Sequence, residues 1–187
     1  VDLCISKGFA LAGVTTASHS SHDAVLRKWL KDEKHGEMEW LNRNVDVRLD
    51  PRNLVEGAAS VICVADRYGK LEEEPLCARD GRIARYARGR DYHKEMKKRL
   101  HSISDTLREE FPGEQFRACV DTAPLLEREF AQRAGIGSVG KHTLLIEQGI
   151  GSWMLLGAIV TTAVIEQTNS SIKEQSDPCA TCTRCID

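Results

Sequence analysis

No stretch of this sequence carries the roughly 18 consecutive apolar residues that a membrane-spanning helix needs. The first residues, Val1-Asp2-Leu3-Cys4, lack the basic start and the apolar run of a secretory signal peptide. The net charge is only −2 at pH 7, so the molecule as a whole is not a basic nucleic-acid binder. These absences predict a cytoplasmic protein without a membrane partner, in which any site for a polyanion is a local patch.

Internal repeats and low-complexity tracts are also absent, and the remaining composition is that of a globular protein. The 187 residues are 41% hydrophobic and 29% charged, which suffices for one domain with its own core. The sequence begins without Met, in a helical pattern, and stops at Asp187 inside a group of cysteines. We therefore expect a fragment that is cut at both ends.

Strand-like apolar runs alternate with helical patterns along the chain, which predicts an α/β (α+β) fold. Helices are expected at 22–34, 91–111 and 124–134, and strands at 9–15, 60–65, 116–120, 144–146 and 153–164. A polar stretch at 166–176 is typical of a linker. We therefore expect one main domain over residues 1–170 and the start of a second over 171–187.

Seven cysteines, an odd number without an export signal, favour free thiols in a reducing compartment over a disulfide framework. Four of the seven are scattered along the chain. Two of these four, Cys63 and Cys119, lie in apolar runs, so we expect them to be buried and inert.

The last three cysteines form a Cys-x2-Cys-x2-Cys run at Cys179, Cys182 and Cys185. Two equal short steps let one tight loop direct three thiolates at an iron–sulfur cluster, as in the bacterial ferredoxin pattern. A structural zinc ion is the alternative ligand. We expect a fourth cysteine just beyond Asp187.

Asp121 follows a predicted buried strand and precedes a predicted helix. Ligands of α/β proteins bind at the C-terminal ends of strands. A half-desolvated carboxyl at such a place can hold its proton nearer to neutral pH and act as a general acid. Asp121 can also cap the helix that is expected from Pro124, and these residues alone favour the cap.

Residues 135–143, Gly-Ile-Gly-Ser-Val-Gly-Lys-His-Thr, are rich in glycine. The spacing between Gly135 and Gly140 matches a Walker nucleotide-binding loop. A helix precedes this segment instead of a strand, however, and His142 stands where that loop has Ser or Thr. We expect the glycines instead to let the backbone approach a large planar ligand closely.

Residues 79–99 hold nine basic side chains against three acidic ones, in a sequence whose total charge is −2. Two interpretations stay open, a solvated helix face and a docking surface for RNA phosphates. Tyr86 and Tyr92 could add stacking on bases. His93 could titrate near pH 7, although a single histidine is more often structural.

Together these motifs resemble the epoxyqueuosine reductase family. The matching stretches run in the family's order and cover nearly the whole chain. They are Arg48-Leu49-Asp50-Pro51 with Leu54, residues 57–62, residues 85–93, Val120-Asp121-Thr122-Ala123-Pro124, residues 134–142, Gly151-Ser152-Trp153, and the cysteine run.

The resemblance implies an enzyme that reduces the epoxide of epoxyqueuosine at the wobble position of tRNA and gives queuosine. Members of this family use a cobalamin and two 4Fe-4S clusters, and we expect an external electron donor to supply the clusters. A nitroreductase-like cobalamin-binding domain is followed in them by a ferredoxin-like domain. We also expect this protein to be a monomer.

The resemblance also assigns roles to single residues. Asp121 matches the family's proton donor, which moves our interpretation of this residue from a cap to catalysis. Cys179, Cys182 and Cys185 match cluster ligands. The positions that match cobalamin contacts, or lie beside them, are Arg48, Ala84, Asp121, Lys141, His142, Leu145 and Leu156. Ser138 is a departure, since many members have an aromatic residue there, and it leaves open what packs against the corrin.

Three other functions compete with this one. A reductive dehalogenase has the same cofactors and a similar layout, but the basic stretch at 79–99 favours an RNA substrate. A simple electron-transfer ferredoxin would not need so long a chain before its cluster motif. A zinc-stapled RNA-binding module would hold zinc where the other candidates hold iron with sulfide.

Overall fold

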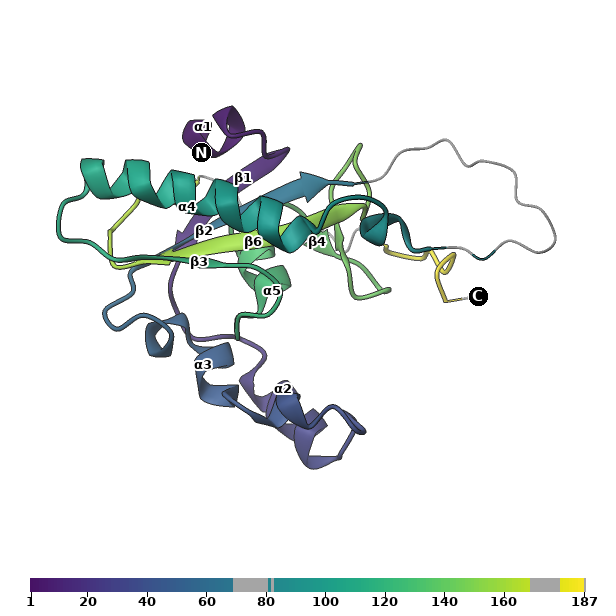
Figure 1. Cartoon of the computed structure of the whole chain (residues 1–187). Helices are drawn as coiled ribbons and strands as arrows, with labels where there is room; N and C mark the ends of the chain where they lie inside the picture. The colour runs from purple at the N-terminus through teal and green to yellow at the C-terminus, as the bar shows by residue number, and fades with distance from the viewer. Residues whose placement is uncertain (69–80, 82, 169–178, 187) are drawn as a thin grey trace.

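The computed structural model describes residues 1–68, 81, 83–168 and 179–186, and a four-stranded antiparallel sheet lies at its centre (Figure 1). The two central strands, which come from distant parts of the sequence, pair over eight residues, from Ser60 opposite Thr161 to Arg67 opposite Met154. The strands, in their order across the sheet, are β1 (Leu11–Thr16), β2 (Ser60–Arg67), β6 (Met154–Thr161) and β3 (Phe116–Cys119).

Alternate residues of the central strands enter two separate hydrophobic cores, because successive side chains of a strand point to opposite faces. On one face Cys63 shares a core with Phe130 of helix α5 (Glu127–Arg133). On the other face Val64 belongs to the core under helix α4 (Tyr92–Glu110). Both faces of the sheet are covered, so β2 is a continuous apolar run and not an alternating one.

Two glycines let the helices approach the sheet closely. A Cβ atom on Gly13 of β1 would overlap the carbonyl oxygen of Ala134, the residue that follows α5. A Cβ atom on Gly157 of β6 would lie 2.8 Å from the Sδ atom of Met96 in α4. The helix on each face is therefore fixed against the strands, and the starts of α4 and α5 both lie near the end of β3.

The remaining elements surround this three-layered core. A lobe below the sheet in Figure 1 contains α2 (Asp23–Lys31) and α3 (Val45–Leu49). It also includes η1 (Glu39–Asn42) and η2 (Pro51–Asn53). Trp40 lies in its η1 helix and Arg48 in α3. Outside the lobe lie α1 (Asp2–Ser6), η3 (Arg85–Ala87), and a small sheet of β4 (Ser138–Val139) and β5 (Leu145–Ile146).

The mixed α/β class that the sequence predicts is confirmed, with one displaced helix. The helix expected at 124–134 begins only at Glu127, because residues 120–125 form two tight turns first. In these turns Thr122 donates its N–H to Val120, and Leu125 donates its N–H to Ala123. The boundary expected between residues 170 and 171 lies outside the described residues.

Two further expectations concern the cysteines and the membrane. Cys63 and Cys119 are buried as expected, and burial raises the pKa of both thiols, that of Cys119 to about 11. Over the part of the chain that the structure describes, no helix has both the length and the apolar character that crossing a membrane requires.

Candidate functional site

Asp121 lies in a strained turn at the end of β3. Its φ angle is +45°, in the left-handed region that non-glycine residues seldom adopt. The N–H of Thr122 closes the turn by donating to the carbonyl oxygen of Val120 at 2.5 Å. The following helix begins at Glu127 and has Leu126 as its N-cap residue. The interpretation of Asp121 as a helix cap is therefore wrong.

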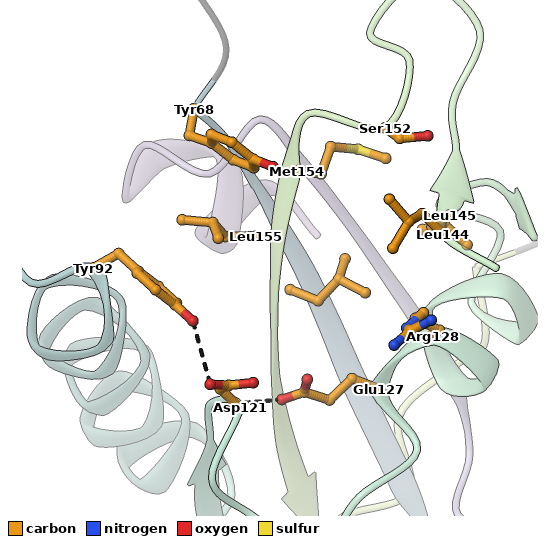
Figure 2. A pocket seen from close by; sticks show the side chains of 11 residues that line it. Tyr68, Tyr92, Asp121, Glu127, Arg128, Leu144, Leu145, Ser152, Met154 and Leu155 are labelled. Carbon is orange, nitrogen blue, oxygen red and sulfur yellow. Dashed lines mark hydrogen bonds between the residues drawn. The ribbon is translucent and has the colours of Figure 1, made fainter. Parts of the chain in front are cut away.

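The first turn of α4 directs two side chains at the carboxylate of Asp121. The Tyr92 hydroxyl donates to Oδ2 at 3.3 Å (Figure 2), and Nε2 of His93 lies 3.0 Å from the same oxygen. On its other side, Nδ1 of His93 lies 2.9 Å from Oδ1 of Asp91, the N-cap residue of α4. The hydrogen bond with Asp121 is the main cause that raises the pKa of His93. His93 therefore links two carboxylates, and both favour its charged form.

A second carboxyl, that of Glu127, holds the turn from the side of α5. Its Oε1 accepts the backbone N–H of Asp121 at 2.7 Å (Figure 2). Glu127 is half-buried, and its desolvation raises its pKa to about 7, against the opposing effect of the hydrogen bond from Asp121. The sequence predicts a half-desolvated carboxyl at Asp121. The Asp121 side chain is 59% exposed, however, and the desolvated carboxyl is that of Glu127.

Sequence reasoning missed Glu127. The available signal was an acidic residue six positions after Asp121, near the start of the next helix. A glutamate at the N-terminus of a helix is common for electrostatic reasons alone, so the pattern did not distinguish this one.

Asp121 and Glu127 open onto a cavity of about 210 Å³ at the N-terminal half of β6 (Figure 2). Leu156 of β6 and Leu145 of β5 contribute to the wall of the same cavity. Three positions that the resemblance connects with cobalamin, Asp121, Leu145 and Leu156, are therefore brought together. The other lining residues are Tyr68, Tyr92, Arg128, Leu144, Ser152, Met154 and Leu155.

Arg48 approaches Asp121 from the lobe below the sheet. Two further cavities, of about 500 and 440 Å³, are lined by both Arg48 and Asp121. The Arg48 guanidinium lies 5.8 Å from the centroid of the Trp40 ring. Its Nε atom is buried and finds no hydrogen-bond partner among the residues that the structure describes, and burial lowers the pKa of the guanidinium. A buried donor without an acceptor is costly, so this position suits a ligand with an acceptor atom.

The other three predicted cofactor positions do not line these cavities. Ala84 is exposed and immediately precedes η3. Nε2 of His142 lies 2.9 Å from Oγ of Ser152, and its Nδ1 accepts the N–H of Leu144 at 3.2 Å. His142 therefore ties its own loop to the start of β6. Lys141 points to another part of the chain.

Lys141 binds the cysteine segment. Its Nζ donates to the carbonyl oxygens of Ala180 at 2.6 Å and Cys182 at 3.1 Å. Its backbone N–H lies 3.4 Å from Sγ of Cys179. The glycine-rich loop and the cysteine segment are therefore joined by one residue, through both its side chain and its backbone.

The three cysteines of the predicted cluster lie at the surface. Cys179 is half-buried, whereas Cys182 and Cys185 are exposed, and the Cys182 N–H donates to the carbonyl oxygen of Cys179 at 2.6 Å. Within the described ranges, no three His, Cys, Asp or Glu side chains converge on one metal position. The donor set, three thiols on one short segment, still has the chemistry that iron–sulfur clusters use.

The described part of the basic stretch lies beside the cavity of Asp121. The Arg85 guanidinium lies 4.5 Å from the centroid of the Trp153 ring, which also packs edge-on against Tyr68 of the cavity wall. Arg88 donates to the carbonyl oxygen of Ile83, and the side chain of Arg90 is 88% exposed. Arg79, Asp80 and Arg82 lie outside the described residues.

Comparisons of the sequence find relatives that are named epoxyqueuosine reductase. The family model described as epoxyqueuosine reductase QueG, DUF1730, matches residues 48–122. An epoxyqueuosine reductase from Xanthomonas campestris pv. campestris is 39% identical over 185 residues, covering 96% of this chain and 51% of that protein. The chain therefore spans about half the length of this curated relative.

Solved structures give the same result. The epoxyqueuosine reductase of Streptococcus thermophilus matches with a TM-score of 0.86 at 28% identity, over 100% of this chain and 50% of that one. An epoxyqueuosine reductase solved with a tRNA-Tyr epoxyqueuosine-modified stem loop gives a TM-score of 0.85 at 26% identity, over 100% and 49% of the two chains. A reductive dehalogenase, at 17% identity and a TM-score of 0.52, shares the fold alone.

Proposed function

The chain belongs to the epoxyqueuosine reductase family, and we propose that it is part of an oxidoreductase that reduces epoxyqueuosine in tRNA to queuosine. The observation that carries this proposal is the cavity at the end of β3, where Asp121 faces an apolar wall that includes Leu145 and Leu156. The relative that was solved with an epoxyqueuosine-modified stem loop supports the choice of substrate.

In this proposal residues 1–170 form a nitroreductase-like domain that binds cobalamin. Leu145 and Leu156 offer apolar contact to the corrin, and Arg48 offers a buried donor that needs an acceptor. Both leucines and Arg48 share cavities with Asp121, so the cofactor and the acid belong to one site. Cobalamin held there would supply the reducing chemistry that the epoxide needs.

Asp121 is the proton donor to the oxygen of the opened epoxide. The whole reduction takes two electrons, which come from the external donor, and two protons, and the oxygen leaves as water. Tyr92 and His93 both contact Oδ2 of Asp121 and so fix the orientation of the carboxyl. After transfer, the carboxylate of Asp121 needs a new proton. His93 can return it, because its ring bridges Asp121 and Asp91 and is exposed to solvent.

Residues 171–187 begin a ferredoxin-like domain, and Cys179, Cys182 and Cys185 ligate a 4Fe-4S cluster that an external electron donor supplies. The contacts of Lys141 support this proposal, because they keep the three thiols beside the domain that binds the corrin. The proposal includes two 4Fe-4S clusters in the full-length protein.

The basic segment before α4 binds the phosphates of the tRNA substrate. Arg88 and Arg90 immediately precede the turn of α4 that holds Asp121, and the exposed Tyr86 ring lies 6.2 Å from that of Tyr92. Charged contacts there would place the modified nucleotide near the acid. An enzyme with this substrate acts in the cytoplasm, and that it acts as a monomer stays a prediction.

The decisive experiment is single-turnover reduction of an epoxyqueuosine-containing tRNA stem loop. The complete protein, reconstituted with cobalamin and iron–sulfur clusters and then reduced, is expected to form queuosine, detected by mass spectrometry of the released nucleosides. Protein reconstituted without cobalamin is the control. If the protein dehalogenates a halogenated phenol and forms no queuosine, the proposal is wrong and the protein is a reductive dehalogenase. No feature of this site favours that activity.

A further inference from the structure

We propose that Glu127 is a positioning residue, which holds Asp121 in its left-handed turn and so directs the acid at the cavity. The inference rests on the proposed role of Asp121 as the acid. The hydrogen bond between Glu127 and the Asp121 backbone is a property of the fold and can be measured without any turnover.

The N–H of Asp121 needs a partner outside the sheet. The last residue of β3 in the ladder is Cys119, which pairs with Ala158 of β6. Beyond it, the Asp121 N–H donates to Oε1 of Glu127 at 2.7 Å. A non-glycine residue in the left-handed region persists only where its surroundings fix it. The hydrogen bond acts on the strained residue itself, whose φ angle is +45°.

The position of Glu127 is well fixed because the rest of α5 packs tightly against the sheet. Phe130 and Ala131 of α5 are 0% and 1% exposed and belong to the core on that face of the sheet. At the end of the helix, the carbonyl of Ala134 lies against Gly13 of β1. A side chain from such a fixed helix can hold a turn residue more accurately than one from another loop.

The two helices hold different parts of Asp121. Tyr92 and His93 of α4 contact its carboxylate, whereas Glu127 of α5 contacts its backbone. Without the Glu127 side chain, the Asp121 carboxylate would keep its hydrogen bonds with Tyr92 and His93. The backbone turn around Asp121 would relax. We expect the geometry of proton transfer to suffer, and the affinity for tRNA to stay unchanged.

The charge on Glu127 changes the strength of its hydrogen bond with the Asp121 N–H. A carboxylate accepts an N–H more strongly than its protonated form does. Burial brings the pKa of Glu127 to about 7, and the charge of Asp121 raises it further, while Arg128 of α5 and His93 of α4 lower it. The Tyr92 hydroxyl and the thiols of Cys63 and Cys119 also lie near it and are neutral at this pH. Arg48 and Glu129 line the same cavity as Glu127. The hydrogen bond from the Asp121 N–H is therefore stronger when Glu127 is charged, although burial of that charge destabilises the fold as a whole as the pH rises through 7.

The test is amide hydrogen exchange, measured by NMR or mass spectrometry on the complete protein. In the wild type, the Asp121 amide should be protected although its side chain is exposed. Glu127→Met has no acceptor and should raise exchange over residues 120–122 by roughly tenfold or more, while residues 100–107 of α4 stay unchanged. Glu127→Gln keeps a neutral acceptor oxygen and should exchange like the wild type at about pH 6, where Glu127 is largely protonated. Glu109→Met, at the exposed end of α4, is the matched control.

Turnover supplies the second readout. In single-turnover reduction, Glu127→Met should lose roughly tenfold or more in rate at unchanged tRNA affinity, because the acid is misplaced. Glu127→Gln should restore most of that rate. If Glu127→Gln stays protected but loses turnover, Glu127 carries a proton and the positioning role is wrong.

The hold is overturned if the wild-type Asp121 amide exchanges freely, or if a folded Glu127→Met protein exchanges as the wild type does. Should Glu127→Met fail to fold, the wild-type measurement decides. A protected Asp121 amide supports the contact with Glu127, and a freely exchanging one overturns it. A wild type that never reduces epoxyqueuosine would end the proposed function and leave the exchange result valid.

Discussion

The backbone N–H of Lys141 lies 3.4 Å from Sγ of Cys179, although the two residues are 38 positions apart in the sequence. The same lysine donates through Nζ to the carbonyl oxygens of Ala180 and Cys182. The resemblance placed Lys141 beside the cofactor contacts. Its contacts make it the residue that links the glycine-rich loop to the cysteine segment.

Lys141→Met should loosen the cysteine segment, because it removes two charge-assisted hydrogen bonds and keeps the length of the side chain. In the metal-free protein, we expect Cys179 to be alkylated several-fold faster than in the wild type. The readout is mass spectrometry after a short pulse of iodoacetamide. Lys94→Met, on an 85% exposed lysine of α4, is the control and should change nothing. Equal alkylation rates in all three proteins would show that the contact does not hold the segment.

Asp121→Asn should abolish most of the proposed reaction while the protein still folds. The amide is similar in size and can accept the hydrogen bonds of Tyr92 and His93, but it carries no transferable proton. We expect a loss of roughly a hundredfold or more in single-turnover reduction by the prereduced protein, the usual scale for general acid catalysis. Asp105→Asn, at a 73% exposed position of α4, should retain full activity. Near-normal turnover of Asp121→Asn would show that Asp121 is not the proton donor.

Reversing the charges of Arg88 and Arg90 should weaken tRNA binding and flatten its salt dependence. Each phosphate contact that is lost lowers the slope of log K against log salt by about 0.9 or less. The measurement is a titration of the tRNA stem loop by fluorescence anisotropy at four salt concentrations. The matched control reverses two exposed lysines, Lys31 at the end of α2 and Lys34 just after it. A slope equal to that of the wild type would show that the two arginines make no phosphate contacts and belong to a solvated face.

The stability of the fold should depend on pH through Glu127. Its pKa is raised from 4.5 to about 7 in the folded protein. The folded protein therefore binds more protons than the unfolded chain between these values. The contribution of the protonated carboxyl is complete below pH 4.5 and is lost as the pH rises through 7. The shift corresponds to a change on the order of 3 kcal/mol in the free energy of unfolding.

Glu127→Gln removes this titration. Its stability relative to the wild type should therefore increase from pH 5 to pH 8, with a rise that approaches that value. Urea unfolding followed by circular dichroism at both pH values measures the difference, and Glu109→Gln is the control. A difference between Glu127→Gln and the wild type that is the same at both pH values contradicts the raised pKa.

The local features of the site could be predicted because they depend on neighbours in sequence. The spacing of Cys179, Cys182 and Cys185 is fixed by a single loop. The position of Asp121 at a strand end follows from the apolar run before it. The cap assigned to Asp121 was wrong for a related reason. Pro124 suggested an immediate helix start, and the sequence does not reveal the two turns that delay it to Glu127.

The sequence by itself determined the α/β class, the family and the residue types available for chemistry, because periodicity and motif spacing are carried by the chain itself. Only the tertiary structure decided that the carboxyl of Glu127 is desolvated, that His93 bridges Asp91 and Asp121, and that Arg48 shares a cavity with Asp121. Burial and pairing are set by segments that meet only when β2, β6 and β3 form one sheet between α4 and α5. The pKa of a side chain depends on those neighbours and not on its place in the sequence.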